Sequence, residues 1–316
     1  MRQKIRIEDL LTIAFCAIMA FLTCLHRDRI PHWTVHIIID ILTALICIII
    51  PWITADKKDP FSFHLRHWYV LIVVPLNFMN LKGVIHGINP NNYDPLLIHI
   101  DHMLFGVNPT QWLQRIINPW LTEYLQWAYM SYFFIPVVLG IVLYKNKNYR
   151  GFRVSATIIL LAFYLSYLGY LVVPAVGPRF TLPHQVPLKG VFLTAQLKAL
   201  LNILEPTPHD CFPSGHTAVA LVCVFLAARY HRKLFWIYVP LVSSLIFSTV
   251  YHRYHYVIDI LAGMALAVLS WWMGNALFNW WEERSPRYQS AREVQGAREG
   301  KNLTAYSRGR GNGPGP

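Results

Sequence analysis

Charged residues are scarce in this sequence. Of its 316 residues only 14% are Asp, Glu, Lys or Arg, whereas 55% are hydrophobic. A soluble domain usually carries about 25% charged residues. The few charges gather in short clusters and leave apolar runs long enough to cross a bilayer, which takes about 20 residues. The composition therefore excludes an ordinary soluble domain and predicts an integral membrane protein.

Cysteine is also rare, and its placement excludes a disulfide framework. The chain has five cysteines, an odd number, and four of them lie inside apolar runs. A disulfide scaffold would have an even number of cysteines at regular spacing in polar segments. Cys211 alone lies outside the apolar runs, and we expect it to have a structural or neutral role rather than to be a reactive thiol. No internal repeat with a period of about 20 to 50 residues is visible.

The apolar runs predict an all-α fold, a polytopic bundle of about eight transmembrane helices. The first run follows MRQKIR as a signal peptide would. It is followed by CLHRDR instead of a small-residue cleavage site, so we expect it to remain as a helix. The expected spans are residues 8–25, 33–54, 67–86, 121–144, 154–174, 215–231, 234–251 and 257–279.

These spans divide the chain into three parts. Residues 1–66 hold two N-terminal transmembrane helices, and residues 67–280 form a larger membrane domain. Residues 281–316 are rich in Arg, Gly, Ser and Pro, cannot bury a core, and predict a disordered basic tail. The long connection 87–120 predicts short helices at the membrane interface.

Acidic residues are the scarcer charge, and the net charge is +12. The basic residues cluster in connections that fall on one side of the membrane if the N-terminus is inside, and few lie on the other side. Cytoplasmic connections carry the excess of Lys and Arg in membrane proteins, so we expect cytoplasmic N- and C-termini and no nucleic-acid partner. The tail is either solvated or in contact with anionic lipid. The few outer basic residues are Arg27, Arg29, Arg115, Arg179, Lys189, Lys198 and Arg253.

Two polar clusters lie at the outer boundary in this topology. CFPSGHTAV opens the sixth span, and YHRYHYVID separates the seventh from the eighth. Ionisable groups at such positions are costly and usually functional. His255 and Asp259 are four residues apart and share one helix face. A carboxylate there can accept the imidazole Nδ1–H and leave Nε2 as a nucleophile or base.

The PSGH sequence predicts an anion site at the start of a helix. Ser214 is a good N-cap after a proline, so Gly215 and His216 lie in the first helical turn. Free backbone N–H groups and the positive end of the helix dipole suit phosphate there. Arg179 and Arg253 can offer bidentate guanidinium groups to phosphate oxygens.

Together the clusters resemble the motifs of the type 2 phosphatidic acid phosphatase superfamily, the lipid phosphate phosphatases and vanadium haloperoxidases. Its second motif is PSGH, at residues 213–216. Its third motif, Ser-Arg-x5-His-x3-Asp, is matched in spacing by Ser248, His255 and Asp259. Thr249 stands at the arginine position of that motif.

The first motif of that superfamily, Lys-x6-Arg-Pro, is matched only by Arg179. Val172 stands at its lysine position and Phe180 at its proline position, and Arg253 could supply the missing cation. The stretches LVVPAVGPR, DHMLFGVNP and YHRYHYVID are more similar to the inositolphosphorylceramide synthase branch and its bacterial relatives. The catalytic resemblance covers roughly residues 165–280.

The resemblance implies a metal-free phosphohistidine mechanism in residues 67–280, with no cofactor. His255 would attack phosphorus, Asp259 would orient it, and His216 would protonate the leaving oxygen. The phosphate oxygens would be held by Arg179, Ser214, the Gly215 N–H and Arg253. We therefore expect a membrane phosphatase that acts on a lipid phosphate or prenyl diphosphate at the outer face. Transfer of a headgroup phosphate to a lipid hydroxyl is the alternative, and a non-enzymatic transporter or metal carrier is a third hypothesis.

Other polar residues have competing interpretations. His252 and the segment 209–211 offer zinc-ligand types, although the resemblance implies metal-free chemistry. His36 and Asp40 repeat the spacing of a His/Asp pair inside the second span, where we expect a buried structural pair rather than a proton relay. For one group on the outer connection we expect solvation at the interface rather than contact with a lipid headgroup: Asp94, His99, Asp101 and His102.

Overall fold

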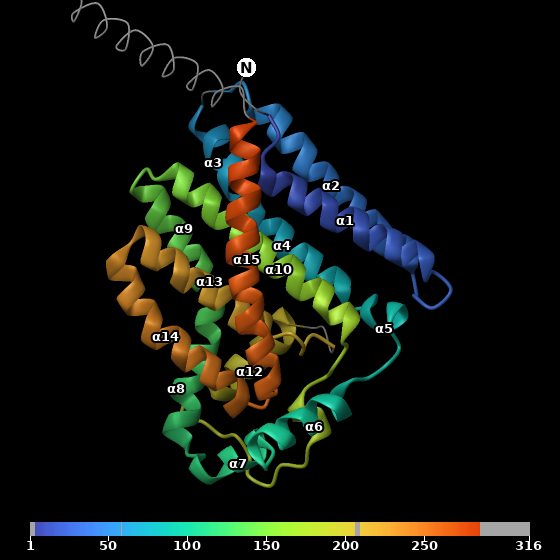
Figure 1. Cartoon of the computed structure of the whole chain (residues 1–316), viewed down its shortest axis with the longest axis vertical. Helices are drawn as coiled ribbons and strands as arrows, with labels where there is room; N and C mark the ends of the chain where they lie inside the picture. The colour runs from blue at the N-terminus through green and yellow to red at the C-terminus, as the bar shows by residue number, and fades with distance from the viewer. Residues whose placement is uncertain (1–3, 58, 206–208, 285–316) are drawn as a thin grey trace, which may run out of the picture.

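The computed structural model describes residues 4–57, 59–205 and 209–284, and over these ranges it contains helices and no β-strand. The N-terminus and the C-terminal end of the last helix lie at one end of the molecule, and α6 and α7 lie at the other (Figure 1). Most of the expected basic tail, residues 285–316, lies outside the described residues.

In the described part of the chain, the helices follow one another without sheets between them. Their bounds are α1 (Ile7–Leu25), α2 (Trp33–Thr54), α3 (Pro60–Trp68), α4 (Val70–Leu81), α5 (Ile85–Ile88), α6 (Asp94–Phe105), α7 (Pro109–Trp112), η1 (Leu113–Ile116), α8 (Pro119–Met130), η2 (Ser131–Phe133), α9 (Ile135–Lys145), α10 (Tyr149–Val172), α11 (Pro178–Thr181), α12 (Thr194–Leu204), α13 (Gly215–Tyr230), α14 (Arg232–Tyr251) and α15 (Val257–Glu283).

Five of these helices are long and apolar enough to cross a membrane: α1, α2, α10, α14 and α15. The stretch from Pro119 to Lys145 would be a sixth span, bent by 51° between η2 and α9. The prediction of an all-helical, multi-span protein is confirmed, but the number of eight spans is not. The expected span 67–86 is broken at Tyr69, so that α4 has 12 residues, and α13 has 16. A hydropathy window adds such short apolar pieces together because it does not detect a break in the backbone.

Helix α13 lies at the centre of the C-terminal bundle, packed against α9, α10, α14 and α15. Its small residues allow neighbouring backbones to approach closely, as in other membrane bundles. Ala218 and Ala220 are fully buried. On α15, a Cβ added at Gly263 would lie 2.6 Å from the carbonyl oxygen of Ser214. This close approach brings the start of α13 against the start of α15.

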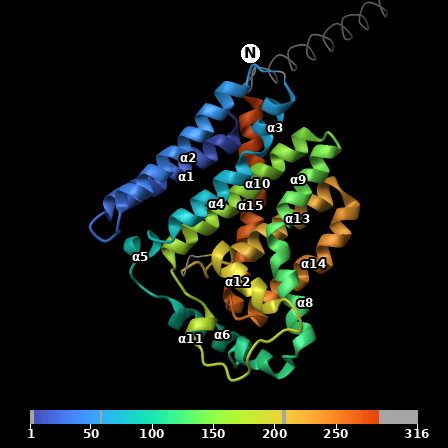
Figure 2. The ribbon, with the colours of Figure 1, turned by 180° about the vertical axis from the view of Figure 1, so that it is seen from behind.

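The N-terminal helices form a separate layer. In Figure 2, α1 and α2 run side by side; α1 packs directly against α10, and α2 packs against α3 and α4. At the end that carries the N-terminus, a buried ion pair joins α1 to α3, and two partly buried ion pairs join α1 and α15 to α10. The pairs are Arg66 with Asp9, Arg153 with Glu8 and Arg153 with Glu282.

The expected His36–Asp40 pair is bridged by a third residue. Nδ1 of His36 lies 2.8 Å from Oδ1 of Asn80, and the Asn80 amide donates to Asp40 at 2.9 Å. The amide of α4 therefore holds the two polar side chains of α2, and the cluster joins these two helices inside the bundle.

Candidate active site

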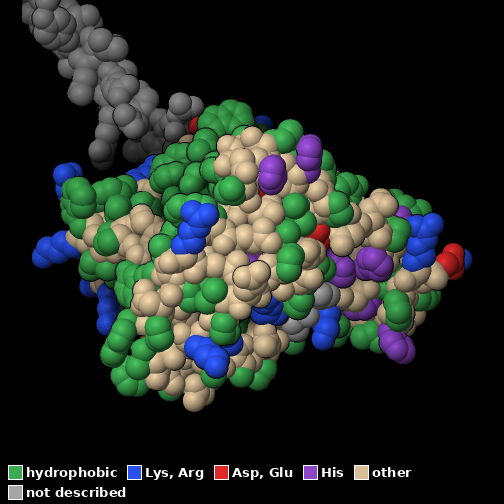
Figure 3. All heavy atoms as spheres, turned by 90° about the horizontal axis from the view of Figure 1, so that it is seen from below, with side chains coloured by type: hydrophobic (Ala, Val, Ile, Leu, Met, Phe, Trp, Pro, Cys, Tyr) green, Lys and Arg blue, Asp and Glu red, His purple; other side chains and the backbone are tan. Residues whose placement is uncertain are grey.

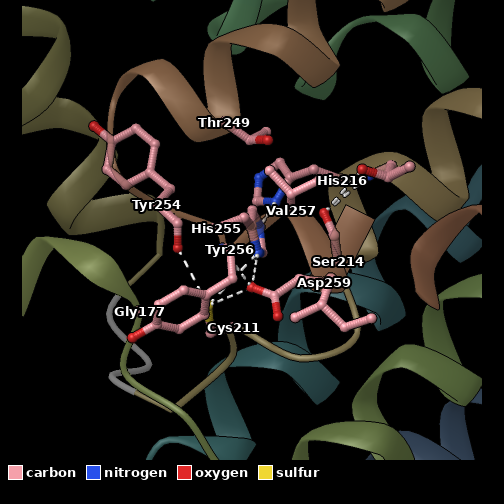
Figure 4. Close-up of polar contacts among 12 residues, drawn as sticks. Gly177, Cys211, Ser214, His216, Thr249, Tyr254, His255, Tyr256, Val257 and Asp259 are labelled. Atoms are coloured by element: carbon pink, nitrogen blue, oxygen red, sulfur yellow. Dashed lines mark hydrogen bonds and ion pairs between the residues drawn. The ribbon is translucent and has the colours of Figure 1, made fainter. Parts of the chain in front are cut away.

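The two polar segments meet at the start of α15. The Ser214 N–H donates to the carbonyl oxygen of Asp259 at 3.0 Å. The Ser214 hydroxyl accepts from the N–H of Thr217, so Ser214 is the N-cap of α13. A proline before this residue and a short polar side chain at the cap are the local reasons why the helix begins here. Figure 4 shows how these segments bring His216, His255 and Asp259 together.

Asp259 is surrounded by donors. Its Oδ2 atom accepts from the Tyr256 N–H at 2.8 Å and from the Cys211 thiol at 2.9 Å, and it lies 3.4 Å from Nδ1 of His255. Asp259 is 0% and His255 3% exposed. A carboxylate in this position holds the imidazole with Nε2 directed away from it, which suits a nucleophile or base. Cys211 is free, as are the other four cysteines.

His216 faces the free side of this imidazole. Its Nδ1 lies 3.4 Å from Nε2 of His255, although 39 residues separate the two in sequence. Its Nε2 lies 2.8 Å from Oε1 of Glu205 and 2.9 Å from the Tyr129 hydroxyl. A carboxylate at Nε2 favours the tautomer protonated on that nitrogen, which leaves Nδ1 as an acceptor toward the site. Sequence reasoning missed Glu205 and Tyr129 because Tyr129 lies within α8 and Glu205 at the end of α12, both outside any short motif.

The two histidines lie on the wall of a cavity of about 230 Å³ that also contains Arg179 and Arg253. The Arg179 N–H donates to the carbonyl oxygen of Arg253 at 2.9 Å, so the two cationic segments run together. The Arg179 guanidinium lies over the rings of Phe180 and Tyr254. The cavity is therefore suited to an anion beside the histidine pair.

A third cation lies near these arginines. Lys198 of α12 is partly buried, and its ammonium group donates to the carbonyl oxygen of Leu188 at 3.1 Å. Burial, followed by the charges of Arg253 and Arg179, lowers the pKa of Lys198 to about 8. Val172, which stands at the lysine position of the family motif, is exposed at the end of α10. Lys198 is thus a candidate for the missing positive charge that the sequence pattern did not indicate.

Two of the predicted phosphate ligands lie behind the cavity wall. Ser214 is fully buried, and its hydroxyl accepts from both the N–H and the hydroxyl of Thr217. Gly215 is buried against Tyr170 and Ser166. Neither residue lines the cavity, whereas Arg179, Arg253, His216 and His255 do.

Two acidic residues of α6 correct an expectation. We expected Asp94 and Asp101 to be solvated, but both are buried. The Asp101 carboxylate accepts from the N–H groups of Val257 and Ile258 at 2.8 and 2.9 Å and so caps α15. His99 and His102 of the same helix are exposed, as expected. The cap was not predictable because α15 begins more than 150 residues later.

Asp94 contacts Tyr256, the residue that precedes α15, and the backbone before Arg179. It accepts from the N–H groups of Val176 and Gly177 at 2.8 Å and from the Tyr256 hydroxyl at 2.7 Å. Gly177 has a φ of 90°, and a Cβ there would lie 2.6 Å from the carbonyl oxygen of Tyr254. Asp94 thus connects the backbone of residues 176–177, just before Arg179, to Tyr256, the residue after His255.

Glu123 of α8 caps the start of helix α12, the helix that ends at Glu205. The Glu123 carboxylate of α8 accepts from the backbone N–H groups of residues 191–194 at 3.0 to 3.2 Å and from the Thr194 hydroxyl at 2.6 Å. A carboxylate at a helix N-terminus satisfies donors that have no partner within the helix and complements the dipole. The wall of the cavity that carries Glu205 is therefore anchored to α8.

One group of side chains among the described residues has the composition of a metal site. The ligand atoms of Cys211, His255 and Asp259 all lie within 4.8 Å of one another. The same atoms already form the contacts around Asp259 described above. His252, also considered as a ligand, lies outside this group; its ring is buried, and burial together with the charge of Lys198 lowers its pKa to about 3.

The end of the molecule at which the site lies presents a few scattered basic side chains and fewer acidic ones. Figure 3 shows Lys, Arg and His among hydrophobic and neutral groups on this face. Such a face favours the approach of an anionic headgroup.

Comparison with known proteins identifies the family. Residues 96–273, more than half of the chain, match the PAP2 superfamily. A stretch of 87 residues is 32% identical to the bacitracin transport permease protein BcrC of Bacillus licheniformis, covering 28% of this chain and 40% of that protein. The chain thus spans less than half the length of this relative, and no solved structure matches. The narrower resemblance to the inositolphosphorylceramide synthase branch stays a prediction. The PSGH motif and the segment that carries His255 and Asp259 both lie inside the matched region. Together with the apolar spans, this match shows that the chain is an integral, multi-pass membrane protein of the PAP2 superfamily.

Proposed function

We propose that this protein is a membrane phosphatase that cleaves a lipid phosphate or a prenyl diphosphate through a phosphohistidine intermediate. The observation that carries the proposal is the 3.4 Å separation between Nε2 of His255 and Nδ1 of His216 on the wall of a cavity that contains two arginines. Membership of the PAP2 superfamily supports the reaction class.

In the first step, the Nε2 lone pair of His255 attacks phosphorus. An N–P bond forms as the bond from phosphorus to the leaving oxygen breaks, and the electron pair of that bond goes to the oxygen. His216, in its protonated form, gives a proton to this oxygen. Asp259 holds Nδ1 of His255 and stabilises the positive charge that the imidazole acquires. General acid assistance of this kind contributes roughly 10²- to 10⁴-fold to the rate.

In the second step, His216 acts as the base. It takes a proton from water, the water oxygen attacks phosphorus, and the N–P bond breaks with its electron pair returning to His255. Inorganic phosphate leaves and His216 is again protonated. Phosphoryl transfer needs mainly positioning and neutralised charge. Arg179 and Arg253 supply that charge, with Lys198 nearby. Ser214 and the Gly215 N–H act at the start of α13 behind the cavity wall, where the cap orients the helix end toward the bound anion.

The catalytic unit is proposed to be residues 67–280, with its site on the extracytoplasmic side and both termini in the cytoplasm. The concentration of Lys and Arg in the connections on the other side supports this orientation. A reporter fused after residue 316 should be cytoplasmic, and a cysteine placed near Lys189 should react with an impermeant label from outside. Protection of that cysteine in intact cells, together with an external reporter, would reverse the assignment.

Transfer to a lipid hydroxyl is the alternative at the same site. Glu205 and Asp210 lie on the cavity wall, where their carboxylates could bind an acceptor hydroxyl. Helix α12, which Glu123 holds in place, could cover the cavity and exclude water from the intermediate. The nucleophile and the intermediate are the same for both reactions. A transporter is the third candidate and predicts ion dependence without phosphate release.

A phosphate-release assay distinguishes these functions. The protein purified in detergent is given phosphatidic acid or a prenyl diphosphate in the presence of EDTA, and inorganic phosphate is measured. Wild type should release phosphate, His255→Ala should not, and His99→Ala is the control, since His99 is exposed on α6. Equal activity in His255→Ala would falsify the assigned nucleophile. Phosphate passed to an added lipid alcohol without release of free phosphate would identify the transferase.

A further inference from the structure

Three kinds of metal ligand meet beside the proposed nucleophile: the thiol of Cys211, the imidazole of His255 and the carboxylate of Asp259 (Figure 4). All three side chains are buried. Sγ of Cys211 lies 2.9 Å from Oδ2 of Asp259 and 3.7 Å from Nδ1 of His255, and this Nδ1 lies 3.4 Å from the same Oδ2. We call these three atoms the ligand triangle. It lies on the Nδ1 side of the ring, away from the Nε2 atom that is proposed to attack phosphorus.

The sides of the ligand triangle match those of a tetrahedral zinc site. With a Zn–S bond of about 2.3 Å and Zn–N and Zn–O bonds of about 2.0 Å, tetrahedral ligands lie about 3.3 to 3.6 Å apart. The two sides that end on Nδ1, 3.7 and 3.4 Å, already agree with these values. The side between Sγ and Oδ2 would have to open by about 0.6 Å. The hydrogen bonds of the ligand triangle therefore hold its atoms where an ion could replace the protons between them.

The surroundings of the ligand triangle favour a cation. Oδ1 of Asp259 is buried and has no hydrogen-bond partner among the described residues, so it could serve as a further ligand atom. Burial, followed by the charge of Asp259, raises the pKa of the Cys211 thiol, and Asp94 and Asp210 act in the same direction. The thiol therefore keeps its proton and is a poor nucleophile on its own. The same negative charges would attract a metal ion.

The ligand types select the ion. A thiolate and an imidazole suit Zn²⁺, whereas Mg²⁺ and Ca²⁺ take oxygen ligands. Three protein ligands with an open fourth position are a usual zinc arrangement. Cys211 and His255 both line the cavity of the site, so an ion can reach the ligand triangle from there.

We propose that the ligand triangle is an inhibitory zinc site. The ion forms bonds to Sγ, Nδ1 and Oδ2, and its two positive charges are balanced by the thiolate and the carboxylate. The thiol gives its proton to solvent. Nδ1 also loses its proton while Nε2 gains one, so the imidazole stays neutral and one proton is released for each ion bound. The electron pair of Nε2 is then bonded to hydrogen and does not attack phosphorus. This regulation rests on the proposed phosphatase function.

Zinc inhibition of the purified protein tests the proposal, with free Zn²⁺ fixed by a metal buffer. In wild type kcat should fall as zinc is raised, KM should stay constant because Arg179 and Arg253 are untouched, and EDTA should restore the rate. Mg²⁺ at the same concentration should not inhibit.

Cys211→Ser removes the thiolate but keeps a donor toward Asp259. Loss of an outer-shell partner already costs about 10- to 100-fold in metal affinity, so this loss of a ligand should raise the half-inhibitory zinc concentration at least tenfold. Each variant is compared with its own metal-free rate. Cys24→Ser is the matched control, since Cys24 is an exposed cysteine on α1, and its half-inhibitory concentration should equal that of wild type.

A second measurement does not depend on turnover. Co²⁺ is added to the metal-free protein without substrate, and the absorption band of a cobalt–thiolate bond is followed. Wild type and Cys24→Ser should show this band at one ion per chain, and Cys211→Ser should not. Binding of this kind by a wild type that releases no phosphate would refute the phosphatase function and leave the metal site standing. Absence of the band in wild type, or equal half-inhibitory concentrations in wild type and Cys211→Ser, would overturn the proposal. A rise in KM without a fall in kcat would also overturn it, because zinc would then compete at the phosphate position.

Discussion

The carboxylate of Glu205 lies 2.8 Å from Nε2 of His216, on the side of the ring opposite to His255. The Tyr129 hydroxyl donates to the other oxygen of the same carboxylate at 2.9 Å. His216, the proposed acid and base, is therefore oriented by its own carboxylate, as His255, the proposed nucleophile, is by Asp259. Each histidine of the site thus has one nitrogen held by an acid and one nitrogen directed toward the partner ring.

Removal of the Glu205 charge should slow the reaction. Glu205→Gln keeps the shape of the side chain but no longer favours a proton on Nε2 of His216. We expect kcat to fall roughly 10²-fold, within the range of general acid–base catalysis. KM should change less, because Arg179 and Arg253, the proposed phosphate ligands, are untouched. The change should also shift the pH profile of kcat, an effect that a purely structural residue would not produce.

Tyr129→Phe is the matched variant for this prediction. It removes the hydroxyl that contacts both Glu205 and His216 and leaves the carboxylate in place, so its effect on kcat should be smaller. A loss of activity equal to that of Glu205→Gln would assign the role to the hydrogen-bond network rather than to the charge.

Asp210 should limit activity at alkaline pH. It lines the cavity of the site, and burial together with the charge of Glu205 raises its pKa from 3.8 to about 7. It is therefore neutral below pH 7 and negative above it, where it repels an anionic substrate. In wild type kcat/KM should fall as the pH rises through about 7. Asp210→Asn should exceed wild type about fivefold at alkaline pH, which corresponds to the ~1 kcal/mol of a charge pair in a high dielectric. Parallel pH profiles for the two proteins would refute this role.

The same pKa shift has a consequence for stability. A carboxyl whose pKa is higher in the folded than in the unfolded state binds more protons when folded. Its contribution to the free energy of unfolding is therefore present at low pH and is lost as the pH rises from 3.8 to about 7. Asp210→Asn should remove this pH dependence from the thermal midpoint, which a series of melting curves in detergent would show.

Asp101 should act through the position of α15. Asp101→Ala leaves the first N–H groups of this helix without their carboxylate, and loss of such a cap costs about 0.5 to 2 kcal/mol. Because His255 precedes the helix by two residues and Asp259 lies in its first turn, kcat should fall while KM for the phosphate substrate changes little. His102→Ala on the exposed face of α6 is the control. An effect on KM alone would instead place Asp101 in substrate binding.

The local parts of the site could be predicted from the sequence, and the long-range parts could not. PSGH and the His255–Asp259 spacing are patterns within a few residues. The cap of Ser214 follows from helix rules. The expectation that His255 and Asp259 share one helix face was wrong, because α15 begins at Val257 and His255 lies before it, although Nδ1 of His255 is still within 3.4 Å of Oδ2 of Asp259. Asp101 and Glu123 also cap helices, but the helices they cap begin far along the chain. No spacing rule connects such partners. Their burial was therefore missed, and solvation was expected for Asp101.

The count of spans failed for a related reason. Apolar composition is a local property and correctly identified α1, α2, α10, α14 and α15. Whether a neighbouring apolar stretch forms one straight helix depends on where its backbone bends. The bend of 51° lies directly before α9, which has Pro136 in its first turn and packs against α13, and the break at Tyr69 lies where α3 and α4 both pack against α2.

The ion pair between Arg66 and Asp9 should govern stability without touching the site. Both side chains are buried, and the Tyr69 hydroxyl also donates to Asp9. Arg66→Ala would leave a buried carboxylate without its cation, which costs about 3 to 5 kcal/mol. The thermal midpoint should fall clearly, whereas kcat/KM measured well below that midpoint should stay near the wild-type value. Lys4→Ala is the matched control, since Lys4 pairs with the exposed Asp56 and such pairs contribute about 1 kcal/mol or less.

Replacing both partners, Arg66→Met with Asp9→Asn, should restore part of the lost stability, because no unpaired charge then remains buried. A double variant as unstable as Arg66→Ala would show that packing of the arginine, and not its charge, holds α3 against α1.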